Sequence, residues 1–147
     1  MIAISLRPVG RDWRTISFAS TLYLSPILDL LLEQIPQKWQ PELRLGLQEA
    51  LVNAAKHGNK LDPSKTVVVH FSMVNDEYWW IILDEGSGFV RSCNQGEEHC
   101  LPNDDSENGR GLCLLGQIFD SVHWNRQGTE LRLCKQVNSR SRLPLIP

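Results

Sequence analysis

The chain has 147 residues, of which 41% are hydrophobic and 22% charged, a composition typical of a globular protein. We therefore expect a single domain over residues 1–147. With 15 Lys and Arg against 17 Asp and Glu, the net charge of −2 gives no support to direct nucleic-acid binding. The apolar runs are shorter than the ~20 residues of a membrane span, and no secretory signal is visible. The four cysteines do not form a disulfide framework, so a cytoplasmic location is expected.

Hydrophobic periodicity predicts the elements of the first part of the chain. Short β-type segments are expected at 2–6 and 15–18, and an amphipathic helix at 22–35. A second helix should begin at Pro41, because proline suits the first turn, and end near Gly58. Apolar residues occur on both sides of this second helix, which predicts that it is covered on both sides.

The rest of the chain is predicted as strands around one loop and one helix. Residues 66–74 and 78–83 are β-branched and apolar, with turn residues between them. Residues 90–108 have no period and are expected to form a long loop. The remaining expected elements are a helix at 109–119, a hairpin of strands at 122–126 and 129–135, and a fraying tail at 138–147. This order predicts an α+β two-layer sandwich, with a mixed, mostly antiparallel sheet covered on one face by helices.

Three polar residues share one stripe of the second predicted helix. Glu49, Asn53 and His57 are spaced four residues apart, so they stack along the helix between its apolar faces. A carboxylate, an amide and an imidazole in such a place are costly unless they have partners. From spacing alone, a solvated polar edge is the more frequent explanation, and a functional site is the alternative.

A glycine-containing segment directly follows the predicted strand at 78–83. Asp84 is followed by Gly86 and Gly88, so a carboxylate lies next to backbone that can approach a flat ligand closely. A tight turn would have the same pattern. The sequence therefore predicts either a turn or a ligand-binding loop at this strand end.

A second glycine-rich segment, Gly109-Arg110-Gly111-Leu112, opens the third predicted helix. The free N–H groups and the positive end of the helix dipole would suit an anion, and Arg110 adds a cation. The segment lacks the Gly-Lys-Ser/Thr of a Walker A loop and does not follow a strand as a dinucleotide fingerprint does. An ordinary glycine-rich helix start remains the alternative.

Taken in order, these segments resemble the motifs of the GHKL (Bergerat-fold) ATPases. Residues 49–59, Glu-Ala-Leu-Val-Asn-Ala-Ala-Lys-His-Gly-Asn, resemble the N box. Residues 84–89 and 109–112 resemble the two glycine boxes, and Gly128-Thr129 matches a small signature near the end. The His-Gly-Asn ending and the small size are similar to the bacterial anti-sigma factor serine kinases and anti-sigma regulatory factors. The resemblance covers about residues 15–135.

The resemblance implies binding of ATP with Mg²⁺ and a role for each motif. Asn53 would hold Mg²⁺ through its side-chain oxygen, and Glu49 would be the base that takes a serine proton. Asp84 would accept a hydrogen bond from the adenine amino group. Residues 90–108 would form a lid over the nucleotide. The other implied nucleotide-binding residues are His57, Gly86, Gly88, Gly109, Arg110, Gly111, Leu112 and Thr129.

The resemblance also implies partners. The family phosphorylates a serine on an anti-sigma factor antagonist of the STAS type, and many members bind a sigma factor and form homodimers. A nucleotide-binding module that sequesters its partner without kinase activity is the alternative, and Glu49 favours the enzyme because a pure binder needs no carboxylate there. A detached histidine-kinase catalytic domain is disfavoured, since the sequence before Glu49 has no room for a phosphoacceptor hairpin.

Overall fold

The computed structural model describes residues 8, 10–88, 107–137, 144 and 146, and only the backbone of 107–112. The strand predicted at 2–6, nearly all of the predicted loop and most of the predicted tail therefore lie outside the described residues. In the described part of the chain, no helix is both long and apolar enough to cross a membrane.

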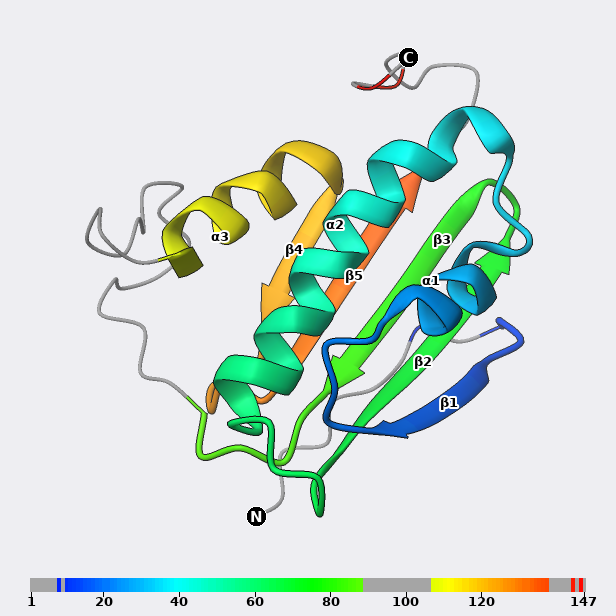
Figure 1. Cartoon of the computed structure of the whole chain (residues 1–147). Coiled ribbons are helices and arrows are strands. Elements are labelled where there is room, and N and C mark those ends of the chain that lie inside the picture. Colours follow the sequence, from blue (N-terminus) through cyan, green and yellow to red (C-terminus); the bar gives the residue numbers. More distant parts are fainter. Residues whose placement is uncertain (1–7, 9, 89–106, 138–143, 145, 147) are drawn as a thin grey trace.

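Five strands form one sheet in the order β1-β2-β3-β5-β4 (Figure 1). All four pairings are antiparallel, so the described sheet has no parallel pair and is not mixed. The strands are β1 (Arg14–Ala19), β2 (Thr66–Val74), β3 (Glu77–Leu83), β4 (Ser121–Trp124) and β5 (Glu130–Gln136). The turn between β2 and β3 places Asn75 and Asp76 at positive φ, as in the tightest hairpin turns.

The helices cover one face of this sheet (Figure 1). They are α1 (Ser25–Leu32), a 3₁₀ turn η1 (Gln37–Trp39), α2 (Gln40–Val52), a π-helical segment η2 (Asn53–Gly58) and α3 (Glu107–Ile118). This arrangement confirms the α+β sandwich. The first helix is shorter than the predicted 22–35: it begins at Ser25, with Pro26 in its first turn, where proline is favoured, and it ends at Leu32.

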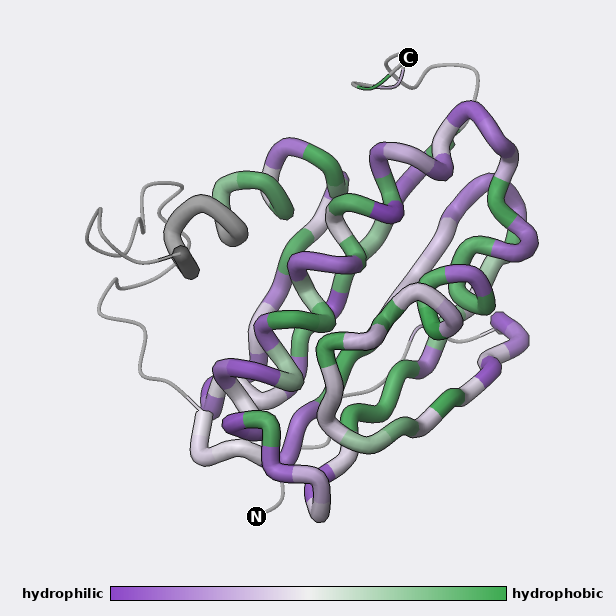
Figure 2. Tube along the Cα trace, in the orientation of Figure 1, coloured by the Kyte–Doolittle hydropathy of each residue, from purple (hydrophilic) through white to green (hydrophobic). Residues whose placement is uncertain are grey.

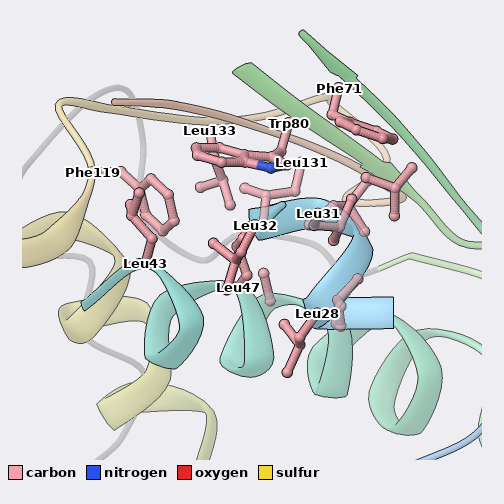
Figure 3. Packing of buried hydrophobic residues seen from close by; sticks show 14 of the residues in the cluster. Leu28, Leu31, Leu32, Leu43, Leu47, Phe71, Trp80, Phe119, Leu131 and Leu133 are labelled. Carbon is pink, nitrogen blue, oxygen red and sulfur yellow. The ribbon is translucent and has the colours of Figure 1, made fainter. Parts of the chain in front are cut away.

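The core lies between the sheet and the helices. Figure 2 shows hydrophobic residues alternating with hydrophilic ones along α2, and Figure 3 shows Leu43 and Leu47 of α2 pointing toward Trp80 of the sheet. These three side chains are fully buried. The expectation that α2 is covered on both sides is wrong at Leu45, which is 39% exposed. Only the face of α2 that the sheet and the neighbouring helices cover is fully buried.

Candidate functional site

The second helix changes its hydrogen-bonding pattern where the N box ends. From Asn53 to Gly58 it is a π-helix, and the N–H of Asn59 donates to the carbonyl of Ala54, five residues earlier, at 2.9 Å. Such π segments are rare and are frequent at functional sites. The predicted single helix is therefore continuous to Gly58, but its last six residues are not α-helical.

Asn59 fixes this helix end to the sheet. Its side chain is fully buried, and its Nδ2 donates to Ser20 Oγ and to the carbonyl of Thr66, both at 2.9 Å. Its Oδ1 accepts a hydrogen bond from the N–H of Glu85 at 2.7 Å. Three segments that are distant in sequence therefore meet at one amide. The sequence indicated Asn59 only as the last residue of the N box, because these contacts depend on tertiary structure.

Asp84 lies directly under the end of η2. A Cβ added at Gly58 would be 2.5 Å from the Asp84 carboxyl carbon, so only glycine leaves room for this carboxylate. Asp84 Oδ1 accepts a hydrogen bond from the N–H of Gly86 at 2.8 Å. Among the described residues, no group donates to Oδ2. This oxygen is available to a ligand that brings a donor.

Burial raises the pKa of the Asp84 carboxyl above its ordinary value. The Gly86 hydrogen bond and the charge of Lys65 act in the opposite direction and only reduce the shift. Within the described residues, no cation lies within ion-pair distance of this carboxylate. A half-buried carboxylate without a cationic partner is a feature of ligand-binding sites, since a partner that supplies a donor lowers its cost.

The two glycines after Asp84 allow close backbone contacts. A Cβ at Gly86 would overlap the carbonyl oxygen of Gly58, and one at Gly88 would overlap the carbonyl oxygen of Gln127. Gly88 also has a φ of +78°, where other residues are strained. The first glycine box therefore packs against the N box on one side and against the β4–β5 hairpin on the other.

The β4–β5 hairpin completes this cluster with Thr129. The carbonyl of Thr129 accepts a hydrogen bond from the N–H of Asp84 at 3.0 Å. Asn125 holds the hairpin turn: its Oδ1 accepts from the N–H of Thr129 at 2.9 Å, and its Nδ2 donates to Thr129 Oγ1 at 3.2 Å. Asn125 was missed in the sequence, where the turn residues adjacent to Gly128 were the only visible signal.

The polar stripe on the second helix faces solvent in part. Glu49 on α2, and Asn53 and His57 on η2, are all partly exposed. Among the described residues, the side chains of Glu49 and Asn53 have no hydrogen-bond or ion-pair partner, so both are free to meet a ligand. The same part of the chain holds no cluster of three His, Cys, Asp or Glu that could bind a metal by itself. A metal here would therefore need oxygen ligands from a bound phosphate.

The second glycine box lies in α3, beside α2 (Figure 1). The helix begins at Glu107, two residues before the predicted start, so Gly109 and Gly111 lie within its first turns. The end of the predicted loop, residues 107–108, is therefore helical. The side chains of Arg110 and Leu112 are outside the described part. The structure thus brings together the N box, the first glycine box and the hairpin, and it does not bring the second glycine box into that cluster.

Comparison with known proteins gives the family. Residues 28–135 match the histidine kinase-like ATPase domain. The chain is 29% identical to the serine-protein kinase RsbW of Bacillus subtilis over 104 residues, which is 66% of this chain and 64% of that protein. It is 32% identical to RsbW of Bacillus licheniformis over 89 residues, 56% of this chain and 55% of that one. It is 24% identical to the anti-sigma F factor of Clostridium perfringens strain SM101 over 103 residues, 67% of this chain and 73% of that one.

The family match covers most of α1 and β5, all of the elements between them, and the residues that meet around Asp84. The chain spans less than two thirds of the length of the Bacillus kinases that it matches. Membership of an ATPase family agrees with the site geometry, in which a carboxylate and glycine-lined backbone converge. The chain belongs to the histidine kinase-like ATPase domain family, as its N box and glycine boxes predicted.

Proposed function

We propose that this protein is an ATP-dependent serine-protein kinase that phosphorylates a STAS-type anti-sigma factor antagonist and binds a sigma factor, as a homodimer. The names of its relatives, a serine-protein kinase and an anti-sigma factor, support this proposal. The observation that carries it is the Asp84 site, where a half-buried carboxylate has one oxygen without a described partner.

The residues of this site fit adenine. The free Oδ2 of Asp84 suits an amino group, which donates hydrogen bonds. Gly58 and Gly86 keep side chains away from the carboxylate, and Gly88 allows the backbone to approach the carbonyl of Gln127. Thr129 lies beside Asp84, because its carbonyl accepts a hydrogen bond from the N–H of Asp84. Together these residues would bind and orient the base.

Asn53 and Glu49 would provide the reactive end of the site. Mg²⁺ prefers oxygen ligands and keeps several of them from phosphate and water, so one amide oxygen from Asn53 is a suitable protein ligand. Glu49 lies one helical turn before Asn53 and would accept the proton of the serine hydroxyl. ATP with Mg²⁺ would supply the phosphoryl group, and the amides of Gly109 and Gly111 would bind its phosphates.

The binding-module alternative uses the same site without transfer. In that case nucleotide would only shape a surface that holds the partner. Glu49 distinguishes the two functions. Its side chain is partly exposed and has no partner among the described residues, whereas a purely structural carboxylate would have one.

The experiment is transfer of labelled phosphate from ATP to a STAS protein, with Glu49→Gln beside the wild-type chain. Gln keeps the size of the side chain but removes the basic oxygen, so transfer should fall by about 10²–10⁴-fold while ATP binding stays intact. Glu33→Gln, at an exposed carboxylate immediately after α1, is the matched control and should transfer normally. Wild-type transfer by Glu49→Gln would overturn the base assignment, and nucleotide-dependent partner binding without any transfer would favour the binding module.

A further inference from the structure

A buried ion pair lies at the opposite end of the molecule from the Asp84 site. The side chains of Lys135 on β5 and Glu42 on α2 are 1% and 0% exposed, and Lys135 Nζ lies 3.9 Å from Glu42 Oε1. The ammonium group also lies 4.6 Å from the centre of the Trp39 ring. In Figure 1 this is the upper end of the view, where α2 begins and where α3 and β5 end.

Lys135 joins this pair to α3. Its Nζ donates a hydrogen bond to the carbonyl of Ile118, the last residue of α3, at 3.0 Å. The last carbonyls of a helix have no partner within the helix, and a cation there also interacts favourably with the helix dipole. Lys135 therefore binds the C-terminal end of α3 to strand β5.

Close packing fixes the same end of α3 against α2. A Cβ at Gly46 would lie 2.7 Å from the Phe119 ring and 3.2 Å from Ile118, so glycine lets the two helices approach closely. Immediately after the helix, the N–H of Asp120 donates to the carbonyl of Cys134 at 2.8 Å. The C-terminal end of α3 is thus held from two sides, by α2 and by β5.

Stability alone gives little reason for a buried ion pair at this place. Removing two charges from water is costly, and well-packed apolar residues of similar size are often equally stable. What a charged pair adds is one defined geometry, because the donor at Lys135 must meet the carbonyl of Ile118. The geometry that it defines is the direction of α3.

We propose that Lys135, held by Glu42, is a positioning residue for the nucleotide phosphates. The inference rests on the proposed function, since it requires that the second glycine box meets those phosphates. That box lies at the N-terminal end of the 12-residue helix whose other end Lys135 holds. Gly109 lies nine residues before Ile118, about 14 Å along the helix axis, so a tilt of about 10° at the held end moves the start of the glycine box by about 2 Å.

The test compares ATP with adenosine, which has the base but no phosphates. In the double variant Glu42→Leu/Lys135→Met both charges are removed together, so neither is left buried alone. Its ATP affinity should fall about tenfold, the order of a lost hydrogen bond to a charged group, while its adenosine affinity should stay within about twofold. Titrations followed by NMR can measure both ligands, and urea unfolding shows that the variant is folded.

The control is Arg44→Met/Asp29→Leu, which removes an ion pair between α2 and α1 that involves neither β5 nor α3. It should leave the ratio of the two affinities unchanged. Gly46→Ala is a second, independent variant that displaces the same end of α3 through Phe119, and it should weaken ATP more than adenosine.

The outcomes separate this inference from the proposed function. If wild-type protein binds ATP more tightly than adenosine, and the folded double variant and Gly46→Ala both keep that ratio, the positioning role is wrong. If wild-type protein binds adenosine and ATP equally, no phosphate site exists and the inference fails while the adenine site stands. If it binds neither, both the proposed function and the inference are overturned.

Discussion

Two carboxylates are withdrawn from solvent at opposite ends of this fold, and their surroundings differ. Glu42 is fully buried and has Lys135 as an ion-pair partner. Asp84 is half-buried, accepts one backbone hydrogen bond and has no cationic partner among the described residues. Burying either carboxylate costs free energy, but among the described residues only Glu42 of the two has a counter-charge.

This difference indicates which end is structural and which end binds a ligand. A buried charge with a built-in counter-charge is satisfied before any ligand arrives. A carboxylate that keeps a raised pKa and a free oxygen is satisfied only when a donor is bound. The predictions below test this distinction, beginning with the largest expected effect.

Glu42→Gln should lower the free energy of unfolding by about 3–5 kcal/mol, because it leaves the Lys135 ammonium buried without its counter-charge. Asp84→Asn should cause no comparable loss, since Asp84 has no cationic partner among the described residues. Urea unfolding of the two variants at neutral pH measures both values. Equal losses in the two variants would remove the distinction between the two ends.

Gly88→Ala should lower the free energy of unfolding by about 3 kcal/mol, because the added Cβ meets the carbonyl of Gln127 and the residue has a left-handed backbone. The matched control is Gly116→Ala on α3, where nothing lies within 4 Å of the added Cβ. That variant should be stabilised by about 0.5–1 kcal/mol, as alanine favours a helix more than glycine. Thermal unfolding should shift in opposite directions for the two alanines, and a shift in the same direction would contradict the crowding at Gly88.

Much of the fold could be predicted from the sequence because its signals are local. The β-branched, apolar run of β2 and the turn residues after it gave both ends of that strand, Thr66 and Val74. The change from α2 to η2 could not be predicted, since hydrophobic spacing does not distinguish an α-helix from one π turn. The π segment is followed by Asn59, whose side-chain partners come from three other parts of the chain.

The candidate site shows the same limit. Asp84 and its two glycines were found because the motif is contiguous, and their roles remain predictions. The contact of Gly58 with Asp84 and the role of Asn125 were missed because each joins residues far apart, or a turn whose geometry the sequence does not state. The pair of Glu42 and Lys135, which are distant in sequence, gave no signal at all.

Asp84→Asn should weaken ATP binding by about 100-fold, which corresponds to about 2.7 kcal/mol. The reason is the Gly86 N–H, which already bonds one oxygen of this side chain. The amide would keep its oxygen on Gly86 and present its NH₂ group where adenine needs an acceptor. Calorimetry measures the affinity. Glu85→Gln is a neighbouring control, since the Glu85 carboxylate accepts a hydrogen bond from the N–H of Thr66. An unchanged affinity in Asp84→Asn would exclude this carboxylate as the adenine ligand.

The smallest expected effect is a pH dependence that belongs to Asp84. Because burial raises its pKa in the folded state above the ordinary value of 3.8, the folded protein holds this proton more tightly than the unfolded chain. As pH rises from 3.8 through the raised folded pKa, this group therefore lowers the free energy of unfolding, and above that pKa the loss is constant.

Asp84→Asn cannot titrate at this position. The difference in unfolding free energy between the variant and the wild type should therefore grow in favour of the variant from about pH 3 to about pH 7. The same titration acts on the ligand in the opposite direction, because only the ionised carboxylate has an acceptor at Oδ2. Wild-type nucleotide affinity should fall as pH decreases through the folded pKa, while the weak affinity of Asp84→Asn should not change there. A carboxylate whose pKa were lowered by folding would give the reverse trend in stability.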